Sequence, residues 1–135
     1  MIDTTLYNTI FSDINDELCL KPTKGDCGSV ALALHAEIPL ETHLYGIHVP
    51  SAIESSRPDH VLVYVPEEDA FCDGKGWWTE GGVRKTWGIE DTKEPRLQRK
   101  PEDFIRSLAY VSISKHRKIR DALHEHNFVD VFNTD

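Results

Sequence analysis

Cys27 is the residue in this sequence best placed for nucleophilic chemistry. It starts a predicted helix, where free backbone N–H groups and the positive end of the helix dipole favour a thiolate over a thiol. The same N–H groups can donate to an oxyanion that forms on a carbonyl under attack. Gly28 adds no side-chain bulk, so we expect an open path to the sulfur and a weak substrate contact there. A small, buried, hydrophobic cysteine is the alternative at this position.

A base and a carboxylate follow Cys27 along the chain. His60 opens the clearest predicted strand, so we expect its imidazole to project from a strand end into a cleft. Asp73 lies beyond a tight hairpin, where its carboxylate could orient the base. Taken alone, Asp73 followed by Gly74 is an ordinary turn signal. The order of the three residues predicts a catalytic triad of Cys27, His60 and Asp73.

The spacing of apolar residues predicts the elements that must position this triad. An amphipathic helix is expected over 3–14, and a break over 21–25 separates it from a second helix over 27–35. The second helix is apolar on every side, so we expect it to be buried all round. Mixed helices and antiparallel strands predict an α+β fold. The predicted strands cover residues 44–49, 60–65 and 70–73.

A segment rich in Trp and Gly follows over residues 74–88. We expect Trp77 and Trp78 to contribute weakly to a substrate groove, and Trp87 could line the same groove; core packing and a protein interface are the alternatives for all three. The glycines suggest a mobile segment, and residues 90–101 have the composition of a solvated linker. A C-terminal helical region is expected over about 101–127, with helices over 102–108 and 115–126.

Length and composition fit a single domain over residues 1–135, with a catalytic-like core over about 25–75. The chain has 15 basic and 23 acidic residues and a net charge of -8. Generic nucleic-acid binding is therefore not expected, because it depends on neutralising phosphates. The charge is uneven: residues 1–83 are acidic and residues 84–120 are basic. The basic stretch is a candidate for covering or recognising a substrate.

Apolar runs in the sequence are too short to span a membrane, and the N-terminal residues do not have the pattern of a signal peptide. Membrane association is therefore not expected. Cys19, Cys27 and Cys72 cannot all pair with one another, which favours a reducing cytoplasm. We expect Cys19 and Cys72 to be core residues.

A metal site is an alternative use of the same side chains. Cys27, His60, Cys72 and Asp73 are of types that bind zinc, but the sequence has neither Cys-x-x-Cys nor His-x-x-x-His spacing. Cys72 and Asp73 should also point to opposite faces of a sheet, because strand side chains alternate. We therefore expect no metal and no cofactor.

Three segments resemble the papain-like superfamily of cysteine enzymes in its broad sense, which includes papain-like peptidases, transglutaminase-like proteins and arylamine N-acetyltransferases. These segments are residues 25–34, 59–65 and 70–74. The resemblance implies a small papain-like core, in which a buried helix with the cysteine at its N-terminal end packs on an antiparallel sheet beside flanking helices. It also implies that the thiol and the imidazole face each other across a cleft.

The sequence thus predicts a cysteine-dependent hydrolase of the peptidase, amidase or isopeptidase type that acts through a thioester. An acyltransferase or transglutaminase-like enzyme with the same triad is one alternative. A non-enzymatic protein-binding module on the same scaffold is another. The expected partner is a peptide, amide or acyl substrate, either free or carried on a protein.

Overall fold

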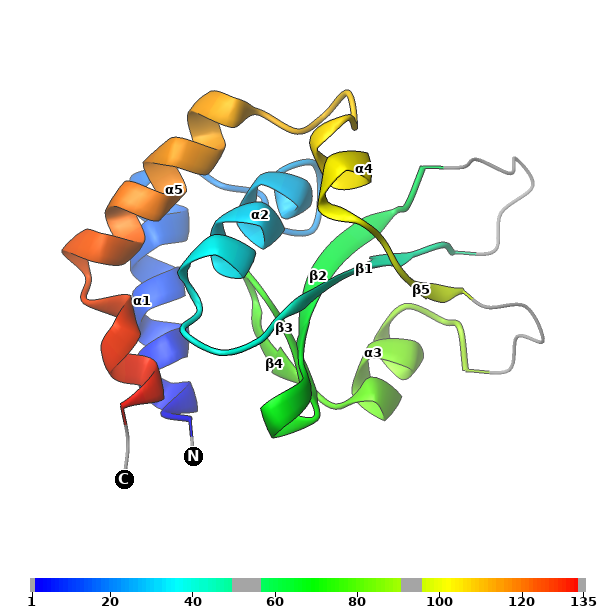
Figure 1. Ribbon diagram of the computed structural model, residues 1–135, viewed down its shortest axis with the longest axis horizontal. Coiled ribbons are helices and arrows are strands. Elements are labelled where there is room, and N and C mark those ends of the chain that lie inside the picture. Colours follow the sequence, from blue (N-terminus) through cyan, green and yellow to red (C-terminus); the bar gives the residue numbers. More distant parts are fainter. Residues whose placement is uncertain (1, 50–56, 91–95, 134–135) are drawn as a thin grey trace.

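An antiparallel sheet forms the centre of the fold (Figure 1). The structure is a computed structural model that describes residues 2–49, 57–90 and 96–133. Five strands occur within these residues, in the order β4-β3-β2-β1-β5 across the sheet. The strands are β1 His43–Ile47, β2 His60–Val65, β3 Ala70–Asp73, β4 Gly76–Trp78 and β5 Leu97–Arg99.

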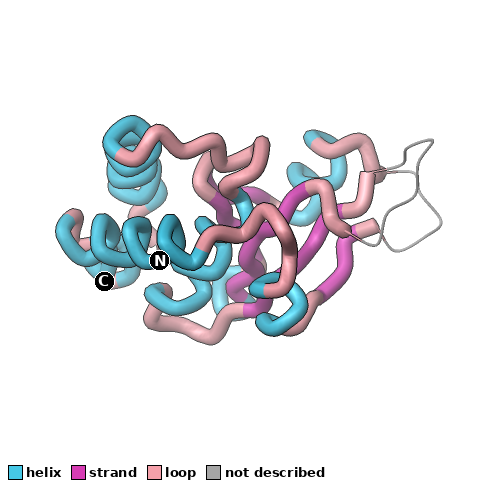
Figure 2. Tube along the Cα trace, turned by 90° about the horizontal axis from the view of Figure 1, so that it is seen from above, coloured by secondary structure: helices cyan, strands magenta, loops and turns pink. Residues whose placement is uncertain are grey.

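Helices lie on both sides of this sheet. They are α1 Thr4–Glu17, α2 Cys27–Glu37, α3 Glu80–Thr86, α4 Glu102–Arg106 and α5 Ile113–Glu125, with short 3-10 helices η1 Pro66–Glu68 and η2 Phe128–Phe132. Helices α1, α2 and α5 gather on one side, while α3 lies apart from them (Figure 1). The turned view in Figure 2 again shows the longer helices to one side of the strands. The predicted α+β class is confirmed.

Among the described residues, none of the helices has both the length and the apolar character that crossing a membrane requires.

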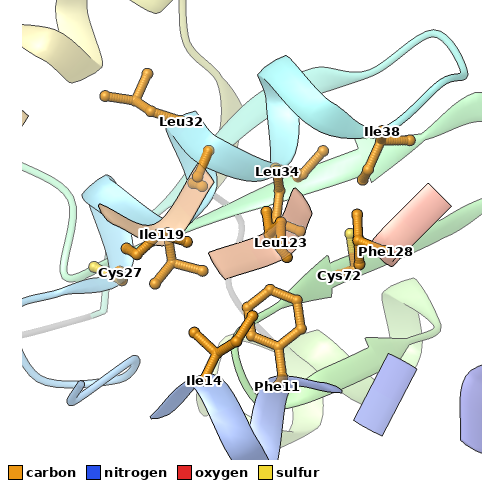
Figure 3. Close-up of a cluster of buried hydrophobic side chains, with 14 of the residues drawn as sticks. Phe11, Ile14, Cys27, Leu32, Leu34, Ile38, Cys72, Ile119, Leu123 and Phe128 are labelled. Carbon is orange, nitrogen blue, oxygen red and sulfur yellow. The ribbon is translucent and has the colours of Figure 1, made fainter. Parts of the chain in front are cut away.

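The helix that begins at Cys27 is the central buried element. Every residue of α2 from Cys27 to Leu34 is buried, as its apolar character on all sides predicts. The helix packs against β2 and against α5. Figure 3 shows the main core around it, with Cys27 at one margin of the cluster and Phe11 and Ile14 of α1 at another. Packing on several sides therefore fixes the start of α2 relative to the sheet.

The two faces of β2 are buried under different side chains. Val61 and Val63 belong to the main core under α2, whereas Leu62 packs in a second cluster with Val83 of α3. Because strand side chains alternate, His60 lies on the same face as Leu62. The first residue of β2 thus points to the side of the sheet that α3 covers.

Strand β3 alternates in the same way. Cys72 is fully buried in the main core, while Phe71 belongs to the second cluster. Asp73 follows Cys72 and points to the face of Phe71, as the alternation predicts. Since β2 and β3 pair as an antiparallel hairpin, His60 and Asp73 reach the same face at the same end of the sheet.

Two segments that the sequence predicts to be irregular are ordered instead. Segment 74–88 contains β4 and α3, because Trp77 pairs with Cys72 in the sheet and the Thr79 hydroxyl caps α3 by accepting from the N–H of Gly82. The expected linker over 90–101 contains β5, which pairs with β1 at the sheet edge. Residues 91–95 of that linker lie outside the described residues.

The prediction that Cys19 is a core residue is wrong, whereas the same prediction for Cys72 is confirmed. Helix α1 ends at Glu17, and Cys19 adopts the left-handed backbone conformation in the turn that follows, with φ 53°. This turn exposes the Cys19 side chain. The protein therefore carries an exposed thiol at Cys19 and buried thiols at Cys27 and Cys72.

Substitution of Gly74 tests the packing at the end of the hairpin. Gly74→Ala should lower the free energy of unfolding by about 1–3 kcal/mol, as overpacking usually does. A Cβ atom there would lie 2.6 Å from the ring carbon Cβ of Pro22. Gly81→Ala is the matched control, because no atom lies within 4 Å of its added Cβ and Ala favours helix α3 by up to about 1 kcal/mol. Denaturant unfolding measures both, and equal stabilities would contradict this account.

Candidate active site

His60 and Asp73 form a buried pair at the open end of the β2–β3 hairpin. The His60 Nε2 atom lies 2.9 Å from Asp73 Oδ2. The His60 residue is 0% exposed and Asp73 is 5% exposed. A buried charge needs a partner, and this pair supplies one for each side chain. The structure thus brings together the predicted base and the carboxylate predicted to orient it.

The second oxygen of the Asp73 carboxylate holds the turn between β3 and β4. Asp73 Oδ1 accepts hydrogen bonds from the N–H groups of Lys75 at 2.8 Å and Gly76 at 3.1 Å, and from Trp78 Nε1 at 3.1 Å. The turn interpretation and the catalytic interpretation of Asp73 are therefore compatible, because each uses a different oxygen. The turn fixes the direction in which Oδ2 meets His60.

The Nδ1 atom is the His60 nitrogen left for the thiol. This atom is buried, and among the described residues it has no hydrogen-bond partner that meets the usual distance and angle criteria. Burial lowers the pKa of His60, but hydrogen bonding and charge from Asp73 and from the Cys27 side chain raise it from 6.5 to about 9. Cys27 is thus among the groups that raise the pKa of His60, although its thiol forms no hydrogen bond with Nδ1 that meets the usual geometric criteria. Hydrogen bonds between catalytic groups are often long or poorly aligned in sites without substrate.

Free backbone donors surround the thiol at the start of α2. The first N–H groups of a helix have no partner inside the helix. Among the described residues, the N–H groups of Cys27, Gly28 and Ser29 have no backbone or side-chain acceptor. These groups are suitably placed to stabilise negative charge that develops next to the sulfur.

The connection between α4 and α5 packs over the start of α2, beside Cys27. A Cβ atom at Gly28 would lie 2.6 Å from Val111 Cγ2 and 3.5 Å from Tyr110 Cε2. The open path expected at Gly28 is therefore wrong: the missing side chain makes room for Tyr110 and Val111. With this cover in place, Cys27 is only 4% exposed.

Tyr110 extends this cover across to the chain just before His60. Its hydroxyl donates a hydrogen bond of 3.2 Å to the carbonyl oxygen of Pro58. The Arg57 guanidinium lies 5.5 Å from the centre of the tyrosine ring, within range of a cation–π contact. Burial, followed by the nearby Cys27 side chain, raises the pKa of Tyr110. Tyr110 thus bridges the helix that carries the thiol and the strand that carries the imidazole.

Trp87, which the sequence groups with Trp77 and Trp78 as a candidate for lining a groove, packs on the imidazole. The two rings stack with centroids 4.6 Å apart and planes at 17°. Trp87 follows α3 directly, so the position of the indole depends on the packing of that helix against the sheet. A sequence pattern that groups three tryptophans with five glycines gives no sign of which indole reaches the histidine.

The two tryptophans proposed as substrate contacts occupy different places. Trp78 donates to Asp73 and so belongs to the support of the pair. Trp77 packs edge-on against Tyr7 and Phe132 on the side of the main core, away from the imidazole. Adjacent strand residues face opposite sides, which is why the structure separates these neighbours.

Cys72 is not part of this site, and the described residues contain no cluster of side chains that could bind a metal ion there. Cys72 lies in the main core, where burial raises the pKa of its thiol. In the ranges 2–49, 57–90 and 96–133, three or more His, Cys, Asp or Glu side chains are nowhere grouped so that they could hold a metal ion.

No protein-family model, curated protein or solved structure matches this chain. The papain-like resemblance therefore rests on the residues around Cys27, His60 and Asp73, and it stays a prediction.

The His60–Asp73 pair should make stability depend on pH. The folded protein holds the His60 proton more tightly than the unfolded chain does, so this contribution is fully present below about pH 6.5 and is lost as the pH rises through about 9. A Cys27→Ala background removes thiol ionisation and also the part of the His60 pKa shift that comes from Cys27, so only the part from Asp73 remains. In that background we expect a loss of roughly 1–3 kcal/mol between pH 6 and 9.5. Denaturant unfolding at both pH values measures it.

Asp73→Asn in the same background is the matched comparison for this pH dependence. The amide keeps an oxygen for the turn but removes the charge that holds the proton on His60, so most of the pH dependence should disappear. The same slope with the carboxylate and with the amide at this position would show that the pair does not control the His60 proton.

The cover over Cys27 should limit access of small reagents. Tyr110→Ala is expected to increase the alkylation rate of Cys27 by iodoacetamide several-fold, because it removes the ring that packs beside Gly28 and whose hydroxyl binds the Pro58 carbonyl. Alkylation of the exposed Cys19 in the same molecule is the internal reference. Mass spectrometry of the two peptides measures both rates, and an unchanged Cys27-to-Cys19 ratio would rule out this role for Tyr110.

Proposed function

We propose that this protein is a cysteine-dependent hydrolase of the peptidase, amidase or isopeptidase type. One observation carries the proposal: a buried imidazole is held on one nitrogen by Asp73, and its other nitrogen is left for the Cys27 thiol. A nucleophile, a base and a third group that orients the base are the parts that covalent catalysis on a carbonyl needs.

In the first half of the proposed reaction, the Cys27 thiolate attacks the carbonyl carbon of an amide. A sulfur–carbon bond forms, and the carbonyl π electrons move to the oxygen. The free N–H groups at the start of α2 donate to this oxyanion. The carbon–nitrogen bond then breaks, and the His60 imidazolium gives its proton to the departing amine. The products of this half are a thioester on Cys27, a neutral imidazole and the released amine.

In the second half, water attacks the thioester. His60 takes a proton from the water as the new carbon–oxygen bond forms, and the sulfur leaves as thiolate. A carboxylic acid is released, and the thiolate–imidazolium pair is restored. An amine in place of water would give acyl transfer with the same residues in the same roles. Asp73 holds the imidazole orientation in both halves.

We also propose that the protein has a papain-like core and that it functions in the cytoplasm. The Cys27 helix buried against an antiparallel sheet agrees with what a papain-like core requires. Three cysteines with free thiols agree with a reducing cytoplasm. The proposed substrate is a peptide, amide or acyl group, either free or carried on a protein.

Competitive labelling tests the proposed nucleophile within one molecule. At pH 6 and limiting iodoacetamide, Cys27 in the Tyr110→Ala protein should react at least tenfold faster than Cys19, because the proposed nucleophile has His60 and the free N–H groups of α2 to activate it and Cys19 has neither. His60→Gln should abolish this difference. Peptide mass spectrometry measures both sites, and the Cys19 rate controls for reagent and pH.

Acylation provides the second measurement for the same proposal. With p-nitrophenyl acetate, the Cys19→Ala protein should release one burst of nitrophenolate and carry one acetyl group on Cys27, whereas the Cys19→Ala/Cys27→Ala protein should show neither. If Cys27 is neither alkylated faster than Cys19 nor acetylated, the protein does not use this thiol as a nucleophile and the hydrolase proposal fails.

A further inference from the structure

Asp26 stands directly before the proposed nucleophile and does not cap its own helix. At the start of α1, the carboxylate of Asp3 accepts a hydrogen bond of 2.9 Å from the N–H of Leu6, which is the usual role of an aspartate in this position. Asp26 occupies the same position in α2 and makes no such bond. The two helix starts therefore use the same residue type in different ways.

Two donors from elsewhere hold the Asp26 carboxylate. Its Oδ1 accepts from Lys115 Nζ at 2.7 Å, and its Oδ2 accepts from the backbone N–H of Lys21 at 2.7 Å. The Asp26 side chain is only 10% exposed, so the ion pair is shielded on the aspartate side. Burial raises the pKa of Asp26, but the hydrogen bonds and charges of Lys115 and Lys21 outweigh it and lower the pKa below its usual value. The carboxylate is thus charged and already occupied.

Lys115 reaches Asp26 because α5 is fixed against α2. The N–H of Ser112, the N-cap residue of α5, donates a hydrogen bond of 3.0 Å to Ser29 Oγ in α2. Ser29 is fully buried, so this contact sets the position of the first turn of α5. Lys115 lies in that first turn, three residues after Ser112.

The Asp26 backbone is in a helical conformation, with φ -98° and ψ 0°, whereas a capping residue is typically extended. Once released from Lys115, and after rotation of this backbone, the carboxylate would compete with a substrate. Asp at the start of a helix normally accepts hydrogen bonds from the first-turn N–H groups, and an anion there is favoured by the helix dipole. In the proposed reaction these N–H groups stabilise the oxyanion. An aspartate bound to them would remove the donors from the reaction and place a negative charge beside the thiolate.

We propose that Lys115 is a positioning residue, which keeps the start of α2 open for the substrate oxyanion by holding the Asp26 carboxylate away from it. This inference rests on the proposed function of Cys27. It assigns a role to a residue of the basic stretch 84–120 that does not touch the substrate. Lys115 holds the Asp26 carboxylate, and the position of this carboxylate decides whether the N–H groups at the start of α2 are free to bind the oxyanion.

Two reagents separate this role from a general effect on the thiol. Alkylation by iodoacetamide depends on the thiolate but forms no oxyanion, whereas acetylation by p-nitrophenyl acetate depends on both. The ratio of the acetylation rate to the alkylation rate of Cys27 therefore reports on the oxyanion donors. Both rates are measured by mass spectrometry in the Cys19→Ala background, with the folded state of each variant checked by its thermal unfolding.

Lys115→Met should lower this ratio about tenfold or more, since loss of one oxyanion donor costs roughly 10²–10³ in rate and a competing carboxylate blocks donors only part of the time. Lys115→Arg should retain most of the ratio, because the guanidinium also binds a carboxylate. Lys118→Met is the matched control on the exposed surface of the same helix and should leave the ratio unchanged.

Asp26→Ala combined with Lys115→Met decides whether the effect passes through the aspartate. With no carboxylate to compete, the ratio should return toward that of the Cys19→Ala protein. A low ratio in this double variant, or an undiminished ratio in Lys115→Met, would overturn the inference while leaving Cys27 as nucleophile. Absence of both reactions at Cys27 in the Cys19→Ala/Tyr110→Ala protein, from which the covering ring has been removed, would instead mean that the proposed function itself has failed.

Discussion

The arrangement of the residues at the open end of the β2–β3 hairpin depends on the hydrogen bonds that the Asp73 carboxylate accepts. One oxygen closes the turn between β3 and β4 and binds the Trp78 indole, while the other binds His60. The backbone carbonyl of the same residue accepts a hydrogen bond of 2.7 Å from the buried Tyr7 hydroxyl, which ties it to α1. Removal of this carboxylate would leave a buried imidazole without its partner, and an unpaired buried polar group is far more costly than the net gain from an ordinary hydrogen bond.

Residues of the basic stretch 84–120 pack around His60 and around the start of α2, which both belong to the acidic part of the chain. Trp87 stacks on the imidazole, Tyr110 packs beside Gly28 next to Cys27, and Lys115 holds Asp26. The charge division seen in the sequence thus corresponds to two structural tasks. Residues before position 84 provide the proposed reacting groups, and residues of the basic stretch enclose them. Enclosure also explains why Cys27 is buried although it stands at a helix end.

Local signals in the sequence were sufficient for the helix that begins at Cys27, for strands β2 and β3, and for the His60–Asp73 pairing, because a tight hairpin and an apolar run leave few alternatives. The enclosing contacts were not predictable in this way. The stacking of Trp87 depends on how α3 packs, and the contact of Val111 with Gly28 depends on where α5 docks. Cys19 was misplaced because the end of α1, and the left-handed turn after it, has no strong sequence signal.

The balance of charge around Cys27 links the His60–Asp73 pair to the Asp26–Lys115 ion pair. In the proposed reaction, the Cys27 thiolate, the His60 imidazolium and the Asp73 carboxylate together leave one negative charge in excess in a region that is nearly free of solvent contact. The dipole and free N–H groups of α2 are the compensation nearest to the sulfur. A second carboxylate lies at that same helix start, on Asp26, and an unpaired charge there would oppose the compensation. The ion pair with Lys115 removes this opposition, so the proposed thiolate depends on a lysine from α5 as well as on the histidine from β2.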